Sequence, residues 1–371
     1  MKEKNVELKN KRILVTGAAG FIGAYLCMEL LERYPEAEII GIDNLNDYYE
    51  VSLKLNRLRN ISEKASRIAL ADVENGFTAG KFSFIKGNLA DKALIEQIFE
   101  EKKPEVVVNL AAQAGVRYSI DHPDIYIESN LIGFYNILEA CRYNPVEHLV
   151  YASSSSVYGG NKKVPFSTED KVDNPVSLYA ATKKSNELLA HAYSKLYNIP
   201  STGLRFFTVY GPAGRPDMFY YSATKRLVAG GKIQIFNYGN CRRDFTYIDD
   251  IVEGVIRVMQ GAPEKKNGED GLPLPPYAVY NIGGGNPENL LDYITVLQEE
   301  LVRANILPDN YDFEAHRELV GMQPGDVPVT YADSEALERD FGFTPHIGIC
   351  EGLRKFAEWY GRYYKCSITR E

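Results

Sequence analysis

Tyr179 and Lys183 are the residues of this sequence whose types and spacing most clearly suggest chemistry. Side chains four positions apart on a helix project from one face. A free phenol titrates near pH ~10, and a neighbouring ammonium group favours the phenolate and lowers that pKa. We therefore expect the pair to take a proton from a substrate hydroxyl, or return one, near neutral pH.

This spacing is common by chance, so the interpretation depends on two further motifs. The first is TGAAGFIG at 16–23, which follows the apolar run 12–15 and opens a helix predicted over 24–34. Such glycines let the backbone turn tightly and approach a pyrophosphate at the positive end of the helix. The alternative is that they serve only close packing of strand against helix. The order of strand, glycines and helix favours dinucleotide binding.

Asp43 stands twenty residues after Gly23, at the end of the next predicted strand, 38–42. A carboxylate at this place can accept hydrogen bonds from the adenosine ribose hydroxyls and would repel a 2′-phosphate. The sequence therefore predicts NAD as the cofactor, in preference to NADP.

The second motif is the serine run YASSSSVYG at 151–159, which follows another predicted strand. A hydroxyl at the carboxyl end of a strand points into the cofactor cleft and can hydrogen-bond the same substrate oxygen as Tyr179. An ordinary serine-rich turn is the alternative. Ser154 precedes Tyr179 by 25 residues, and that interval together with Lys183 favours the catalytic interpretation.

Strand-like and helical patterns alternate along the first 210 residues, which predicts a doubly wound parallel α/β (Rossmann) sheet. Further strands are expected at 82–85, 106–110, 148–152 and 202–206, and further helices at 94–102, 125–143 and 178–197. We expect an NAD-binding domain over 11–210, with later returns near 240–262 and 277–285. A smaller interleaved substrate-binding region would occupy 211–364. The stretches 61–81 and 261–276 are expected to be surface loops.

Composition excludes several classes of protein. The chain has 371 residues and a formal net charge of −8, which argues against nucleic acid as a partner. We expect no membrane span and no signal peptide, because no apolar run is long enough and the first eleven residues are charged. Five scattered cysteines indicate reduced thiols and a cytoplasmic protein. No metal site is expected, since the five histidines form no HExxH pattern.

At this point the chain resembles the extended short-chain dehydrogenase/reductases, specifically the NAD-dependent nucleotide-sugar 4-epimerases. The resemblance extends over about residues 11–364. The motifs that carry it are TGAAGFIG (16–23), NLAAQAGVRYS (109–119), YASSSSVYG (151–159), YAATK (179–183), LRFFTVYGP (204–212), RRDFTYIDD (242–250) and QPGDV (323–327). Within the family, IDNLNDYY (42–49), GRPDM (214–218) and MQPGDVP (322–328) are most similar to the branch that acts on UDP-glucuronate.

The resemblance implies a role for each matching residue. Tyr179 would be the proton acceptor, Ser154 its hydroxyl partner, and Lys183 the bridge to the nicotinamide ribose. The expected cofactor contacts are Gly17, Gly20, Phe21, Ile22, Gly23, Asp43, Asn44, Asn88, Leu89, Ala111, Tyr179 and Lys183. The expected substrate contacts are Ser154, Ser155, Ser156, Thr208, Arg215, Phe236, Arg243, Asp326 and Arg117. In this set Arg243 would bind the diphosphate, Asp326 the nucleotide ribose, and Phe236 the uracil ring.

The sequence departs from the family pattern at three positions. Asn88 stands where the family usually has an acid near the adenine, which puts that contact in doubt. Thr208 and Gln323 replace the Asn and Arg of the galactose epimerases, which puts specificity for glucose and galactose in doubt.

The implied reaction is an epimerisation at C4 of a UDP-sugar. Tyr179 removes the C4 hydroxyl proton while hydride leaves C4 for NAD, and the 4-keto sugar turns over before hydride returns to its other face. For UDP-glucuronate the intermediate is a β-keto acid that can lose CO₂, so its carboxylate must be held.

Arg215 is the residue expected to hold this carboxylate, because a guanidinium can bind a carboxylate at two points. An arginine of a surface loop is the alternative. Arg117 is the second candidate, although contact with the diphosphate or a dimer partner fits it better.

Sister activities of the same fold remain alternatives. They are UDP-glucose or UDP-N-acetylglucosamine 4-epimerase, UDP-glucuronate decarboxylase and, least favoured, a non-enzymatic NAD-binding regulator. In the 4,6-dehydratases an Asp-Glu pair takes the positions of Ser155 and Ser156, and decarboxylases usually have Glu at the second. Both acids are absent here, and Tyr179 and Lys183 are both retained.

The helices near 125–143 and 178–197 carry more apolar positions than one sheet face can cover, and the matching helices pair in this family. We therefore expect a homodimer.

Overall fold

The computed structural model describes residues 1–268, 271–322 and 327–366. In these residues the strands are β1 Arg12–Thr16, β2 Glu38–Asp43, β3 Phe77–Ala79, β4 Phe82–Lys86, β5 Val106–Asn109, β6 His148–Ser154, β7 Ser201–Phe206, β8 Thr208–Tyr210, β9 Ile233–Ile235, β10 Arg242–Tyr247, β11 Lys266–Asn267, β12 Pro273–Leu274, β13 Tyr277–Ile282, β14 Pro287–Asn289 and β15 Arg317–Leu319. The α-helices are α1 Phe21–Arg33, α2 Val51–Ser66, α3 Lys92–Lys102, α4 Tyr118–Asp121, α5 Pro123–Tyr126, α6 Gly133–Tyr143, α7 Leu178–Tyr197, α8 Phe219–Val228, α9 Ile248–Met259, α10 Leu290–Arg303, α11 Glu335–Phe341 and α12 Ile349–Tyr364.

An eight-stranded sheet with the order β13-β7-β6-β5-β1-β2-β4-β3 forms the centre of the fold. Its strands pair in parallel, except for the antiparallel edge strand β3. The short apolar runs predicted as strands form β1, β5 and β6, and these strands are buried because the sheet is covered on both faces. The predicted doubly wound parallel sheet is therefore confirmed.

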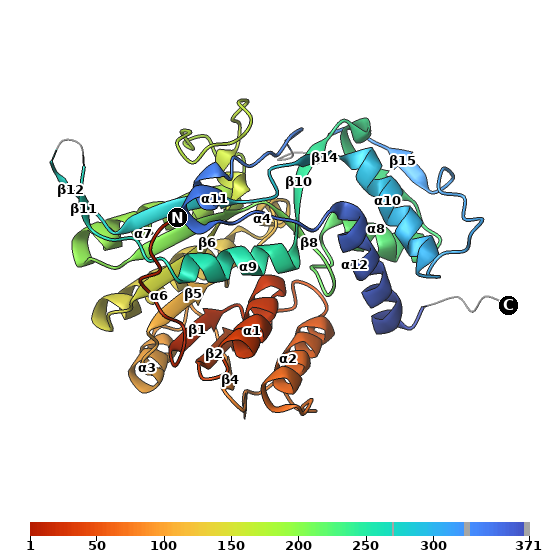
Figure 1. Cartoon of the computed structure of the whole chain (residues 1–371). Coiled ribbons are helices and arrows are strands. Elements are labelled where there is room, and N and C mark those ends of the chain that lie inside the picture. The colour runs from red at the N-terminus through yellow and green to blue at the C-terminus, as the bar shows by residue number, and fades with distance from the viewer. Residues whose placement is uncertain (269–270, 323–326, 367–371) are drawn as a thin grey trace.

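Helices cover both faces of this sheet. The helices α1, α2 and α9 contribute to one apolar core, and Figure 1 shows α1 beneath α9 on that side. The helices α3, α6 and α7 contribute to a second core on the opposite face. The order of strands reverses between β1 and β5, so their carboxyl ends diverge into a crevice. In open α/β sheets this switch point is the place where ligands bind.

Smaller sheets follow residue 207. One contains β14, β10 and β8, and another pairs β15 with β9. Figure 1 shows β8, β10, β14 and β15, with α8, α10 and α12, gathered at one end of the large sheet. The chain also returns to the large sheet, where β13 pairs in parallel with β7. We propose that the boundary between the cofactor-binding part and the substrate-binding part lies near residue 210.

Local structure adds detail to the expectations at two places and departs from them at a third, where 61–81 is not only a loop. The stretch 61–81 contains the end of α2 and the strand β3, and 261–276 contains the short hairpin of β11 and β12. Helix α2 escaped detection because the buried polar residues Lys54 and Arg57 interrupt its apolar stripe. The helix expected over 125–143 begins at Pro123, and its residues Ile127–Ile132 form a π-helical turn before α6.

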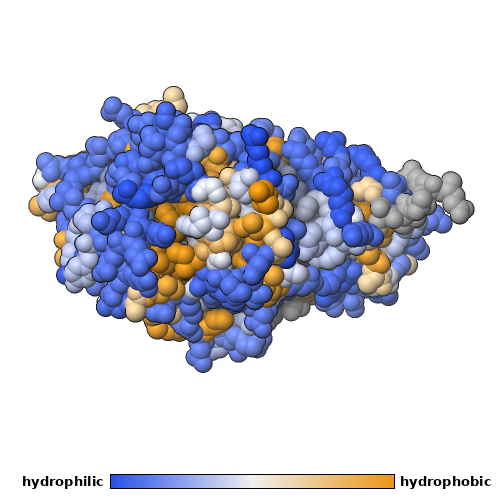
Figure 2. Space-filling view, turned by 90° about the horizontal axis from the view of Figure 1, so that it is seen from below, coloured by the Kyte–Doolittle hydropathy of each residue, from blue (hydrophilic) through white to orange (hydrophobic). Residues whose placement is uncertain are grey.

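One face of the molecule carries both hydrophilic and apolar residues (Figure 2). Figure 2 shows one face with hydrophilic residues at its flanks and apolar residues gathered toward its middle. In the described residues no helix is both long and apolar enough to cross a bilayer. The described residues also contain no cluster of three or more His, Cys, Asp or Glu side chains that could hold a metal ion.

Candidate active site

The catalytic candidates Tyr179, Lys183 and Ser154 come together where α7 crosses the carboxyl end of β6. The Ser177 side chain starts α7 by accepting a hydrogen bond from the Ala180 amide, so Tyr179 lies in the first turn. Lys183 is buried, and its Nζ donates to the carbonyl oxygen of Ala152 at 2.8 Å. This bond fixes α7 against the strand that ends in Ser154.

The expected effect of Lys183 on Tyr179 was wrong in this structure. Burial raises the pKa of Tyr179, while a hydrogen bond with Ser154 and the charge of Arg215 oppose that rise. Burial also lowers the pKa of Lys183, to about 8. The ammonium of Lys183 is directed at a backbone carbonyl, and desolvation of the phenol outweighs the charges around it. Ser154 and Arg215 are thus the groups that favour ionisation of Tyr179.

A buried hydrogen-bond network holds the serine run in place. The hydroxyl of Ser153 donates to Glu187 at 2.7 Å, and Arg205 donates to both oxygens of the same carboxylate at 2.8 and 2.9 Å. Glu187 lies two turns after Tyr179 on α7, so it joins that helix to β6 and β7. The network therefore determines how the strand carrying Ser154 faces the helix carrying Tyr179.

The glycine-rich turn lies between β1 and α1, next to β5. Gly17 has a φ of +70°, and a Cβ at this position would lie 2.9 Å from the amide nitrogen of Ala111. Only glycine fits this approach without strain. The helix α1 begins after Gly20 with no side chain capping its first amides. Free amides at the positive end of a helix fit the pyrophosphate of NAD.

Asp43 lies at the end of β2 beside this turn. Its two carboxylate oxygens accept hydrogen bonds from the amides of Ala19, at 3.2 Å, and Leu45, at 2.9 Å. Each oxygen has a further lone pair, so the carboxylate can still accept bonds from ribose hydroxyls. Asn88 donates to Glu128 at 2.8 Å, which supplies an acid next to the position where the family usually has one. The residues present therefore fit NAD.

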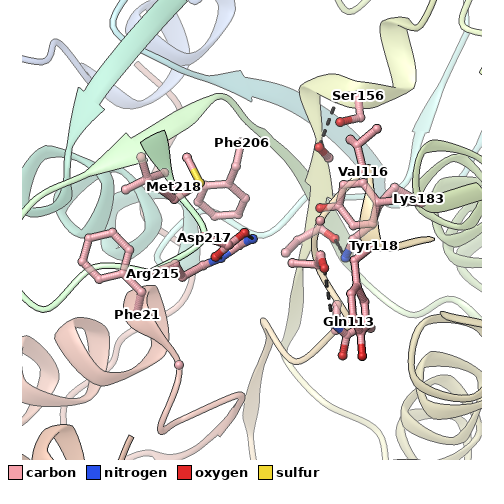
Figure 3. Close-up of a pocket in the computed structure, with 18 of the residues that line it drawn as sticks. Phe21, Gln113, Val116, Tyr118, Ser156, Lys183, Phe206, Arg215, Asp217 and Met218 are labelled. Carbon is pink, nitrogen blue, oxygen red and sulfur yellow. Dashed lines mark hydrogen bonds and ion pairs between the residues drawn. The ribbon is translucent and has the colours of Figure 1, made fainter. Parts of the chain in front are cut away.

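One cavity of about 920 Å³ contains both groups of predicted residues. Its wall includes Gly17, Gly20, Phe21, Ile22, Gly23, Asp43, Asn44, Asn88, Leu89, Ala111, Arg117, Ser154, Ser155, Ser156, Tyr179, Lys183, Thr208, Arg215, Phe236 and Arg243. Figure 3 shows Phe21 and Arg215 on one side of this cavity and Lys183 on the other. The remaining predicted site residue, Asp326, lies outside the described residues, as does Gln323.

The part of the cavity lined by Arg117, Phe236 and Arg243 is aromatic and cationic, unlike the glycine-rich turn. The guanidinium of Arg117 lies 4.5 Å from the centre of the Phe236 ring, which joins the loop after β5 to the segment after β9. Arg243 donates to the carbonyl oxygens of Arg242 and Pro328, at 3.1 and 3.0 Å, and lines the same cavity. An aromatic ring with arginines beside it suits a nucleotide base and its phosphates.

Several residues of the site were not predicted individually. Asp217 forms an ion pair with Arg215 and also accepts from the hydroxyl of Tyr48. Both lie in stretches that carry the family resemblance, IDNLNDYY and GRPDM, so the sequence did contain a signal. Asn130, in the π-helical turn, bonds the backbone of Gln113 and the hydroxyl of Thr182. No pattern marked Asn130, because a π-helical turn has no sequence period of its own.

Comparison with known proteins agrees with this geometry. Protein CapI from Staphylococcus aureus is 48% identical over 360 residues, which cover 95% of this chain and 99% of that protein. A protein named probable UDP-glucuronate 4-epimerase from Rhizobium meliloti is 39% identical over 365 residues, covering 96% and 99%. The crystal structure of UDP-glucuronic acid 4-epimerase from Bacillus cereus with UDP-glucuronic acid and NAD has a TM-score of 0.78 and 29% identity, covering 95% and 100%.

The family itself is identified by a direct match. Residues 13–283 match the model of the NAD dependent epimerase/dehydratase family. This match covers most of the chain, including the glycine-rich turn, the serine run and the pair Tyr179 and Lys183. The resemblance noted from the motifs and the prediction of NAD are therefore confirmed. The chain belongs to the NAD dependent epimerase/dehydratase family and is an NAD-dependent enzyme.

Proposed function

We propose that this chain, an NAD-dependent nucleotide-sugar epimerase, interconverts UDP-glucuronate and UDP-galacturonate. One observation carries the proposal: Arg215 lies on the wall of the cavity that also contains Tyr179 and Ser154. Its charge is near enough to oppose the burial that raises the pKa of Tyr179. A cation this close to the reacting phenol suits a sugar that bears a carboxylate at C6.

The names of relatives support the same substrate. The R. meliloti protein and the B. cereus structure are both named for UDP-glucuronate. The relative from S. aureus is more similar in sequence, and its name specifies no substrate. The proposal therefore depends on the residues of the site together with these names.

Bound NAD would supply the redox chemistry, by accepting a hydride from C4 of the sugar and giving it back. The chain's own residues hold and move the proton. Tyr179 takes it from the C4 hydroxyl, and Ser154 orients that hydroxyl and stabilises the phenolate. Lys183 fixes α7 on β6 through Ala152. Because hydride and proton both return to the sugar, the reaction requires no further acid or base.

The carboxylates on the cavity wall argue against the sister activities. In the described residues that line the cavity they are Asp43, Asp121 and Asp217. Asp43 accepts bonds from two backbone amides, and Asp217 is paired with Arg215. Ser155 and Ser156 occupy the positions where dehydratases and decarboxylases carry acids. The described wall therefore carries serine at both positions where a sister enzyme would place an acid beside Ser154.

We also propose that the substrate's nucleotide lies between Phe236 and Arg243, with Thr208 near the sugar. Thr208 begins β8, lies seven residues before Arg215 and lines the same cavity, which supports a position near the sugar for both. Arg117 lies against Phe236, which favours a role at the base or diphosphate over contact with the C6 carboxylate.

The proposal is tested by incubating the purified enzyme with UDP-glucuronate, UDP-glucose and UDP-N-acetylglucosamine and resolving the products by NMR. We expect UDP-galacturonate from the first and little or no product from the others. Arg215→Ala should lower turnover of UDP-glucuronate sharply, because removing one partner of a desolvated charge pair costs about 2–5 kcal/mol. Any residual activity on UDP-glucose should fall by a smaller factor, because that substrate loses only the effect of Arg215 on the pKa of Tyr179. Equal losses on both substrates would show that Arg215 does not recognise the C6 carboxylate.

A further inference from the structure

We propose that Asp217 is a positioning residue that fixes the guanidinium of Arg215 with its unpaired edge toward the substrate carboxylate, and that Tyr48 in turn fixes Asp217. This inference rests on the proposed function, because it concerns how the same site holds a C6 carboxylate. Asp217 and Tyr48 would then support the carboxylate site without contacting the substrate carboxylate, and Arg215 could act as the clamp without either of them.

The contact between Arg215 and Asp217 is a two-point ion pair. Nε of Arg215 donates to Oδ1 of Asp217 at 3.0 Å, and Nη2 donates to Oδ2 at 2.5 Å. A guanidinium has five N–H groups in a rigid plane. The bonds to Asp217 use Nε and one hydrogen of Nη2, and the Tyr48 hydroxyl also interacts with the guanidinium, so the edge of Nη1 and the second hydrogen of Nη2 is the one that can face a substrate. Because the group is planar, a bond along one edge determines the direction of the edge that remains.

The free edge belongs to the reaction cavity. Figure 3 shows Arg215 and Asp217 extending from the side of Phe206 and Met218 toward the wall that carries Lys183. Their side chains are 27% and 29% exposed, so the pair is accessible from the cavity but shielded from bulk solvent. Tyr179 senses both charges, since Arg215 lowers its pKa and Asp217 raises it against the larger effect of burial.

Tyr48 holds Asp217 from the cofactor side. Its hydroxyl donates to Oδ2 of Asp217 at 3.1 Å. The ring of Tyr48 packs edge-on against that of Tyr118, with centroids 4.8 Å apart. A Cβ on Gly115 would lie 2.5 Å from the Tyr48 hydroxyl, so glycine at this position leaves room for it. Tyr48 follows Asp43 by five residues, and the segment that meets the cofactor therefore also supports the carboxylate clamp.

The charge of Asp217 has an energetic consequence. It raises the pKa of Arg215 against the effect of burial, and the two side chains together are neutral. A substrate carboxylate thus meets a guanidinium whose charge is already compensated, and it binds less tightly than it would to a free cation. In exchange, the carboxylate is held in one orientation. Asp217 reduces affinity and increases geometric control.

Control of orientation matters because the 4-keto intermediate is a β-keto acid. If the C5–C6 bond aligns with the C4 carbonyl, that bond breaks and CO₂ leaves. The electron pair moves into the enolate of the C4 ketone, and C5 then takes up a proton to give UDP-4-keto-pentose. The hydride removed from C4 is not returned, so each CO₂ lost leaves one NADH. A carboxylate bound in one plane is kept out of this alignment.

The test compares Asp217→Asn with Tyr48→Phe and with Glu253→Gln as a matched control. Glu253 pairs with Arg257 on α9, and its change likewise converts a paired carboxylate to an amide. Asp217→Asn should lower KM for UDP-glucuronate and lower kcat for epimerisation by about tenfold, since misplacing a reacting group typically costs one to two orders of magnitude. The share of UDP-4-keto-pentose, and NADH formed per turnover, should rise by at least a similar factor. Tyr48→Phe keeps the packed ring. It should change KM, kcat and the share of UDP-4-keto-pentose in the same directions as Asp217→Asn, by smaller factors.

The outcomes separate this inference from the proposed function. If the wild-type enzyme produces no UDP-galacturonate from UDP-glucuronate, the proposed function fails, and this inference falls with it. In a second outcome, the wild type produces UDP-galacturonate while Asp217→Asn and Tyr48→Phe keep its KM and its ratio of UDP-galacturonate to UDP-4-keto-pentose. In that case only the positioning role is overturned. A loss of kcat in Asp217→Asn with unchanged KM and product ratio would also overturn it, because a purely structural effect predicts that result. Glu253→Gln should match the wild type throughout.

Discussion

Lys183 donates from its ammonium group to the carbonyl oxygen of Ala152 at 2.8 Å, and this contact joins the catalytic helix to the strand that ends in Ser154. Ala152 lies on β6, and Ser154 is the last residue of that strand. The spacing of Tyr179 and Lys183 on α7 thus has two consequences. One side chain reaches the substrate end of the cavity, and the other fixes the helix on the sheet.

Activity should depend on pH with a definite sign. Burial raises the pKa of Tyr179, so most of the phenol is protonated at neutral pH, and the reactive phenolate increases as pH rises. We expect kcat/KM for the hexose substrate to increase from pH 6 to 8, by up to about tenfold per unit where the phenol limits the rate. Ser154→Ala should displace this rise to higher pH, since the Ser154 hydrogen bond lowers the pKa. A flat profile, or a displacement to lower pH, would contradict the assignment.

Removal of the Tyr179 hydroxyl should abolish most turnover. Tyr179→Phe retains the ring, which packs edge-on against Tyr126 at 6.1 Å, so we expect the fold and the bound cofactor to persist. Turnover should fall by roughly 10²–10⁴, the usual contribution of a positioned acid or base. Ser154→Ala should cause a smaller loss. Steady-state rates at matched NAD content measure this, and nearly normal activity in Tyr179→Phe would show that another group moves the proton.

The purified enzyme should contain NAD without any being added, because the catalytic cycle regenerates it. Denaturing the protein and assaying the supernatant for NAD and NADP tests this. Asp43→Asn should lower NAD content and increase acceptance of NADP, because it removes the charge that repels a 2′-phosphate while keeping an oxygen that can accept from Leu45. Finding NADP in the wild-type protein would overturn the role given to Asp43.

Arg57 should prove important for stability. It is 1% exposed, and its five N–H groups donate to Ala19, Tyr49, Ala213 and Gly214. It thereby ties the glycine-rich turn to the residues before Arg215. Lysine offers only three donors, so Arg57→Lys leaves buried carbonyls unpaired, each at a cost of about 1–3 kcal/mol. We expect a loss of roughly 2–5 kcal/mol in the free energy of unfolding.

Urea denaturation followed by circular dichroism measures this loss. Arg59→Lys, on the same helix but half-exposed, is the control and should unfold like the wild type. If Arg57→Lys were as stable as Arg59→Lys, the carbonyls would have to be satisfied in another way. NAD content would then report whether the glycine-rich turn is still ordered.

The comparison of sequence with structure shows which signals are local. β1, the glycine-rich turn and α1 were predicted because strand, turn and helix each have their own residue pattern within a short stretch. The pairing of Tyr48 with Asp217 joins positions 169 residues apart, and no spacing in the sequence indicates it. Helix α2 was missed for the same reason, since Arg57 on its buried face is satisfied by carbonyls from distant segments. In the sequence alone, a buried polar residue cannot be distinguished from a surface residue. Its burial is explained only when its tertiary partners are known.

We expect the chain to self-associate through an apolar face formed by exposed side chains of 118–143 and α7. These side chains are Ile120, Ile127, Ile132, Tyr135, Tyr143, Leu188, Leu196 and Tyr197. The π-helical turn and α6 both contact α7, so the helices that carry these residues are neighbours. Exposed apolar side chains gathered on neighbouring helices often mark an interface. We propose that a second copy of the chain covers it.

Light scattering at micromolar concentration should give twice the chain mass of 41.7 kDa. Leu188→Glu combined with Leu196→Glu should shift the particle to the monomer, since the two side chains are 60% and 70% exposed and a buried unpaired carboxylate is costly. Their exposure also means that the monomer should still fold. Ile68→Glu is the matched control, because Ile68 is 63% exposed and lies after α2, outside the apolar face. A wild-type particle of single-chain mass, or a double variant that stays at twice that mass, would contradict the assignment of this face.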